Sequence, residues 1–147
     1  MRAFRKKHSL VNKNKSEIIS LLTESLKHYT ELEFAYIHGS FLNEEQFGDI
    51  DIAVYLKEGA SLPKDSITKL EIDLEVQLEK IVRYPLDIRV INYSPLSFRY
   101  NVLKGGKLLF ARNEDILTNF TEKTISAYID FVHYRKRYLK EVLNLEV

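Results

Sequence analysis

Several features are absent from this chain, and each absence excludes a class of protein. The 147 residues contain no cysteine, so the chain has neither a disulfide framework nor a thiolate metal site. No apolar run approaches the roughly 20 residues that a membrane-spanning helix needs. The basic start, MRAFRKKHSL, lacks the apolar segment of a signal peptide. We therefore expect a cytoplasmic protein without membrane segments.

Charge and composition are otherwise ordinary. A net charge of +1 gives no general attraction to nucleic acid or to a membrane surface, so we do not expect nucleic acid as a direct substrate. Apolar residues make up 45% of the chain and charged residues 29%, as in globular proteins. This length predicts one domain, residues 1–147, with a single substantial core.

The most informative stretch is residues 36–56, YIHGSFLNEEQFGDIDIAVYL, which predicts a strand, a glycine turn, a short helix and a second strand. Asp49 and Asp51 stand at the start of the second strand. Side chains alternate between the faces of a strand, so both carboxylates point the same way. The apolar residues between and after them point into a core.

This pattern indicates a site for a metal and a phosphate. Neighbouring carboxylates repel each other unless they share a cation, and Mg²⁺ is typically held by one or two carboxylates together with substrate phosphates. Gly39 and Ser40 lie where a strand ends and a helix begins. A glycine there allows backbone N–H groups to approach an anion closely.

A third carboxylate lies in the stretch YPLDIRVIN, where Leu86 to Ile91 predicts another strand. Asp87 and Arg89 share one face of this strand. Asp87 is either a surface residue at the strand entry or a third member of the acidic site. Arg89 either pairs with Asp87 or contacts a phosphate.

The combination of Gly-Ser, the spacer 41–48 and D-I-D resembles the signature of the DNA polymerase beta-like nucleotidyltransferase superfamily. The chain is most similar to the minimal nucleotidyltransferases (MNT) of prokaryotes. The resemblance covers residues 33–115 and implies an α/β (α+β) fold, with a mixed β-sheet flanked by helices. In this superfamily a neighbouring strand supplies a third acidic residue, which would be Asp87.

Periodic apolar residues predict the helices around this core. Asn14 and Glu17 resemble a capping box that opens a first helix, and a second helix should cover 66–82 with a solvated outer face that includes Glu71, Glu75 and Glu79. Ser94 and Pro95 predict the N-cap and first residue of a third helix. A short strand, 107–111, and a long C-terminal helix, 114–145, complete the chain.

The last helix and the N-terminus offer surfaces for a partner. Five aromatic residues interleave with basic ones in the helix, and they either pack in the core or contact a partner; they are Phe120, Tyr128, Phe131, Tyr134 and Tyr138. This pattern resembles the C-terminal helix of nucleotidyltransferases that act as antitoxins. The basic residues Arg2, Arg5, Lys6 and Lys7 form either a solvated terminus or a contact arm.

The resemblance to MntA-type antitoxins of HEPN/MNT toxin–antitoxin systems implies a specific reaction. ATP would be the donor, two Mg²⁺ ions the cofactors, and a tyrosine hydroxyl of a HEPN ribonuclease toxin the acceptor of AMP. Asp49, Asp51 and Asp87 would bind the metals, and Asp87 would orient the attacking hydroxyl or take its proton. Gly39, Ser40 and Arg89 would bind the nucleotide.

The chain also departs from the family pattern. Many relatives carry a basic residue soon after Gly-Ser, whereas this chain has Phe41, Leu42 and Asn43. A missing phosphate contact would weaken nucleotide binding unless Arg89, Lys104 or Lys107 replaces it. Two alternatives remain: an antitoxin that acts by binding alone, and an enzyme that modifies a small molecule such as an aminoglycoside.

Overall fold

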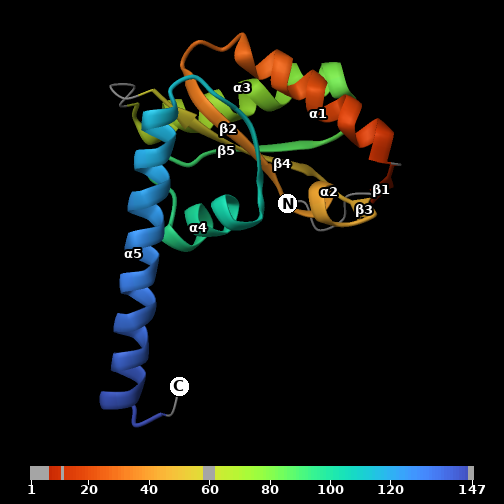
Figure 1. The fold of residues 1–147 in the computed structure, drawn as a ribbon. Coiled ribbons are helices and arrows are strands. Elements are labelled where there is room, and N and C mark those ends of the chain that lie inside the picture. Colours follow the sequence, from red (N-terminus) through yellow and green to blue (C-terminus); the bar gives the residue numbers. More distant parts are fainter. Residues whose placement is uncertain (1–6, 11, 58–61, 146–147) are drawn as a thin grey trace.

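The computed structural model describes residues 7–10, 12–57 and 62–145, and within them a four-stranded sheet forms the centre of the molecule (Figure 1). The strand order is β5-β4-β2-β6. β2 is antiparallel to both of its neighbours, whereas β4 and β5 are parallel, so the expected mixed sheet is confirmed. The strands are β2 (Leu32–His38), β4 (Ile50–Leu56), β5 (Leu86–Val90) and β6 (Lys107–Ala111).

Helices cover both faces of this sheet. α1 and α3 lie on one face, and α4 and α5 lie on the other (Figure 1). Leu22 of α1 and Leu78 of α3 are buried in the larger core, while Val102 of α4 and Phe120 of α5 are buried in the smaller one. The helices are α1 (Asn12–Lys27), α3 (Lys64–Val82), α4 (Leu96–Gly105) and α5 (Glu114–Glu141).

The starts of the helices fit the sequence prediction unevenly. α1 begins at Asn12, so the expected capping box at Asn14 lies inside the helix and that prediction is wrong. α4 has Pro95 at its N-cap position, and Ser94 instead donates its hydroxyl to the carbonyl of Ile91 at 3.1 Å. α5 has a side-chain cap, because the side chain of Asn113 accepts hydrogen bonds from the N–H groups of Asp115 and Ile116.

α3 also completes the edge of the sheet. β5 is an edge strand, whose outward N–H groups would otherwise lack partners in the sheet. Carboxylates of α3 accept these N–H groups at 2.8 Å each: Glu79 from Leu86, Glu75 from Ile88 and Glu71 from Val90. The expectation that these glutamates lie on a solvated face is therefore wrong.

The spacing of these hydrogen bonds has a geometric cause. Four residues advance a helix by about 6 Å, and two residues advance a strand by about 6.6 Å. An acidic residue at every fourth position of α3 therefore meets every second N–H of β5. We call this set of three bonds the glutamate ladder.

A small second sheet, which the sequence did not predict, lies beside the main one. β1 (His8–Ser9) pairs antiparallel with β3 (Gln46–Phe47). Phe47 is fully buried and packs edge-on against Phe41 of the short helix α2 (Ser40–Asn43), with ring centroids 4.8 Å apart. The proposed contact arm falls largely outside the described residues, which exclude Arg2, Arg5 and Lys6.

α5 is longer than the body it packs on. Its first half contacts α4, where the ring of Tyr128 stacks on that of Tyr100 at a centroid distance of 3.7 Å. Its second half extends away from the sheet (Figure 1). The helix ends at Glu141, before the expected 145. In the described residues, no helix has the length and apolar character needed to cross a membrane.

Candidate active site

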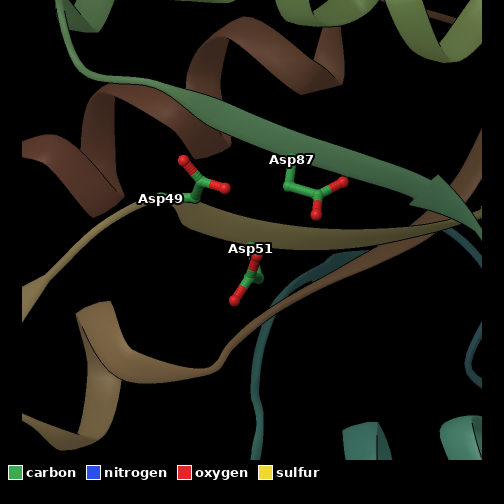
Figure 2. Close-up of side chains that lie close together, drawn as sticks. All are labelled: Asp49, Asp51 and Asp87. Carbon is green, nitrogen blue, oxygen red and sulfur yellow. The ribbon is translucent and has the colours of Figure 1, made fainter. Parts of the chain in front are cut away.

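Two parallel neighbouring strands bring the three predicted carboxylates together. Asp51 lies in β4 directly beside Asp87 in β5, and Asp49 lies just before β4 (Figure 2). Ile50, Ile52 and Val54 are buried on the opposite face, so the alternation of the strand turns Asp49 and Asp51 to the same side. Asp51 shares the sheet face of α4 and α5.

The geometry of these carboxylates suits a hard cation. One oxygen from each of Asp49, Asp51 and Asp87 lies within 4.8 Å of the others, and all three side chains are half-buried. A set of carboxylate oxygens at this separation fits Mg²⁺, which takes oxygen ligands. The expectation that the three residues lie together is confirmed, and their binding of a metal stays a prediction.

The turn after β2 is built against this cluster. His38 pairs with Asp51 across β2 and β4, and Gly39 follows with φ +83°, a conformation that residues with side chains rarely adopt. A Cβ atom at Gly39 would clash with Oδ2 of Asp51. The glycine therefore allows the backbone before Ser40 to lie close to the carboxylates, where a phosphate would approach them.

A pocket of about 220 Å³ opens over Asp51 and Asp87, two of the three carboxylates. Nε of Arg89 lies 3.5 Å from Oδ1 of Asp87, so the predicted pairing of these two residues is present. The guanidinium also lies 5.9 Å from the ring centroid of Phe98 in α4. Arg89 is 62% exposed in its side chain, so it can turn toward a ligand without leaving the pocket.

His38 also lines this pocket, although we predicted no chemical role for it from the sequence. Its ring meets that of Phe98 edge-on, with centroids 5.6 Å apart. Burial lowers the pKa of His38 from its ordinary value; the negative charge of Asp87 opposes this change, and the positive charge of Arg89 adds to it. Burial thus favours the neutral form of the His38 ring. The sequence signal for this residue is its position directly before Gly39.

The missing basic residue after Gly-Ser is not replaced within the pocket by either lysine considered. Lys104 and Lys107 do not line it, whereas Arg89 does. A different lysine stabilises the short helix after the turn: Lys15 of α1 donates a hydrogen bond to the carbonyl oxygen of Phe41 in α2 at 2.8 Å. Arg89 is thus the cation that the described pocket offers to a phosphate.

Comparison with known proteins agrees with this geometry. The family model "Polymerase beta, Nucleotidyltransferase" matches residues 21–115. No curated protein matches the chain.

Solved structures resemble the chain over most of its length. One is a complex of a tri-AMPylated Shewanella oneidensis HEPN toxin with an MNT antitoxin, in which a chain is 24% identical with a TM-score of 0.59; the match covers 89% of this chain and 97% of that one. Another is a toxin–antitoxin structure with AMP-PNP, in which a chain is 26% identical with a TM-score of 0.62. That match covers 90% of this chain and 99% of the other. An MntA–HepT toxin–antitoxin structure is 22% identical with a TM-score of 0.59, covering 90% and 99%.

Proposed function

Because the chain belongs to the polymerase beta nucleotidyltransferase family, we propose that it transfers AMP from ATP to a tyrosine hydroxyl of a HEPN toxin. In this proposal the chain is the antitoxin, and the modification silences the toxin. We also propose that the reaction takes place in the cytoplasm, where ATP is available. The observation that carries the proposal is the cluster of Asp49, Asp51 and Asp87, with carboxylate oxygens within 4.8 Å of one another.

The three carboxylates would hold Mg²⁺, with two ions as the proposed number. Bound Mg²⁺ supplies positive charge that stabilises the attacking and leaving oxygens of a displacement at phosphorus. The donor set fits this cofactor, since all three ligands are hard oxygens on one side of the sheet. Without a cation, three adjacent carboxylates would only repel one another.

The remaining residues hold the reactants. The turn at Gly39 and Ser40 would bind the β- and γ-phosphates, and Arg89 would contact a phosphate beside Asp87. The tyrosine oxygen attacks the α-phosphorus and forms a new P–O bond, while the bond to the β-phosphate oxygen breaks and pyrophosphate leaves. Asp87 would orient the attacking hydroxyl and take its proton, which requires the tyrosine oxygen to lie within hydrogen-bond distance of the carboxylate.

The proposed partner rests on the similar structures and on α5. A tri-AMPylated HEPN toxin occurs in one similar complex, and AMP-PNP in another. In this chain, the projecting half of α5 exposes Phe131, Tyr134 and Tyr138 by 50%, 69% and 46%. Tyrosine is enriched at the centres of protein interfaces, so this surface suits the docking of a protein acceptor.

Intact-mass measurement tests the reaction directly. The chain is co-purified with the product of its neighbouring gene and then incubated with ATP and Mg²⁺. We expect the partner to gain the mass of one or more AMP groups. Asp87→Asn should reduce the transfer of AMP by orders of magnitude. Its melting temperature should be unchanged or raised, because the substitution removes a charge from a repulsive cluster. Asp73→Asn, on the exposed side of α3, is the matched control.

Other outcomes would support the alternatives. Stable association without a mass change would indicate an antitoxin that acts by binding alone. Transfer of AMP to a small hydroxylated molecule, with no partner bound, would indicate a small-molecule enzyme. Retained transfer by Asp87→Asn, together with a loss of stability, would show that Asp87 is structural.

A further inference from the structure

A second cavity lies on the same face of the sheet as the candidate active site. Its volume is about 510 Å³, within the usual range for ligand sites. Tyr55 of β4, Arg99 of α4 and Lys123 of α5 line it, and it shares no lining residue with the pocket over the carboxylates. Tyr55 stands four residues beyond Asp51 in β4, which separates the two sites by about 13 Å along the strand.

Two residues that line this cavity carry buried polar groups without a hydrogen-bond partner among the described residues. Thr124 is only 1% exposed, and its hydroxyl has no hydrogen-bond partner among the described residues. Nε of Arg99 is likewise buried without an acceptor there. A buried donor without an acceptor costs free energy, and the guanidinium keeps its charge. Both residues line the same cavity, with less than 1 Å² of each atom exposed, so a small movement of the side chains would bring these groups to a bound acceptor.

Thr124 differs from other helical threonines of this chain. Thr23, Thr68 and Thr121 each donate the hydroxyl to the carbonyl four residues earlier, at 2.8, 3.1 and 2.8 Å. That local bond is the usual solution for a threonine inside a helix. The hydroxyl of Thr124 makes no such bond and lies buried beside the cavity, with less than 1 Å² exposed.

The charges around the cavity indicate the chemistry of the ligand. Arg99 and Lys123 provide two positive charges, and Asp115 provides one carboxylate. A phosphate monoester carries a charge of about −1.5 to −2 at pH 7, and its oxygens match the fork of a guanidinium. The amide of Asn92 is already used, since it both donates to and accepts from the backbone of Leu56.

We propose that this cavity binds a small phosphate monoester of about mononucleotide size, separately from the candidate active site. The phosphate contacts Arg99, Lys123 and the hydroxyl of Thr124. A sugar hydroxyl or an amino group of the ligand donates to Asp115. The apolar wall formed by Tyr55, Ile116 and Phe120 covers the rest of the ligand.

Isothermal titration with AMP tests the proposal, in EDTA so that no metal supports binding at the carboxylates. We expect saturable binding, with inorganic phosphate as a competitor. Arg99→Gln and Lys123→Gln should each weaken binding by about tenfold or more, as expected for the loss of a charged hydrogen bond. Thr124→Val, which keeps the shape of the side chain, should weaken it by about three- to tenfold.

Three controls make the test decisive. Asp49→Asn/Asp51→Asn should bind AMP as wild type does, and Lys136→Gln, on the exposed end of α5, should also have no effect. Circular dichroism verifies that each variant is folded. Because Lys123 is exposed, we expect Lys123→Gln to fold, and it tests the proposal even if Arg99→Gln does not fold. Equal affinity of wild type and Lys123→Gln, loss of binding in the aspartate variant, or no binding at millimolar AMP would each overturn the proposal.

Discussion

At the scale of single residues, Gly39 fixes how the backbone meets the carboxylates. Its φ of +83° disfavours any side chain, and a Cβ atom there would also displace the carboxylate of Asp51. The first effect arises from the strain of the backbone and the second from the space that the carboxylate fills. The position therefore tests whether the turn serves the site.

We expect Gly39→Ala to lose ATP binding and to lose about 1–3 kcal/mol of stability, as is typical of a residue forced into a strained conformation. Gly48→Ala is the control, because a Cβ there meets no atom within 4 Å. Titration with ATP and Mg²⁺ and urea unfolding measure the two effects. Wild-type ATP binding by Gly39→Ala would contradict the assignment of this turn.

His38 makes stability depend on pH in the metal-free protein. Burial lowers its pKa in the folded state, whereas the unfolded chain has the ordinary value of 6.5. As pH falls through 6.5, the unfolded chain binds the proton first, so the free energy of unfolding decreases until pH reaches the folded pKa. His38→Gln should lack this part of the decrease. The ring-proton NMR titration of His38 should have its midpoint below 6.5; a midpoint at or above 6.5 would contradict the prediction.

The sequence predicted where the three carboxylates lie, but it did not indicate that His38 lines the same pocket, and the cause is physical. Asp49 and Asp51 follow from the two-residue period of a strand, and the neighbouring strand that carries Asp87 follows from the resemblance. A single histidine has no period, so its place depends on the ring of Phe98, which lies far away in the sequence.

At the scale of elements, the glutamate ladder shows what amphipathic patterns leave out. A pattern of apolar and charged residues sorts α3 into a buried and an exposed face, and it classes glutamates with the exposed face. It contains no information about an edge strand with open N–H groups nearby. The bounds of the strands of the main sheet and of α3 could be predicted closely, but the contact between α3 and β5 could not.

The ladder predicts a measurable cost for losing one glutamate. We expect Glu75→Ala to lower the free energy of unfolding by about 1–3 kcal/mol, because the part-buried N–H of Ile88 loses its acceptor. Gln77→Ala, at an exposed position of the same helix, controls for the change in helix propensity. Urea unfolding compares the two variants, and an equal change in both would exclude a stabilising role for the ladder.

At the scale of the whole molecule, one face of the sheet carries two sites and a projecting helix. The candidate active site lies at one end of β4 and the second cavity at the other. α5 packs on this face with its first half and leaves its second half exposed. Of the aromatic residues in α5, Phe120 packs in the core as one alternative from the sequence expected, whereas Tyr134 is exposed and its contact with a partner stays a prediction.

The projecting half of α5 should contribute to partner binding without contributing to folding. We expect Tyr134→Ala/Tyr138→Ala to weaken association with the neighbouring gene product by about tenfold or more, as for residues at the centre of an interface. The melting temperature should stay unchanged, because neither side chain is part of the buried core. Tyr93→Ala, 83% exposed and outside α5, is the control. Wild-type affinity of the double variant would place the partner elsewhere.

The glutamate ladder has a further consequence for how other chains can join this sheet. An open sheet edge is a template to which an extended segment adds as a new strand, in peptide recognition and in aggregation alike. On β5, the ladder occupies three of the backbone donors that such a segment would need. Addition of a strand along β5 would require α3 to detach first. An extended segment that joins this sheet would therefore pair with β6, the strand at the other edge.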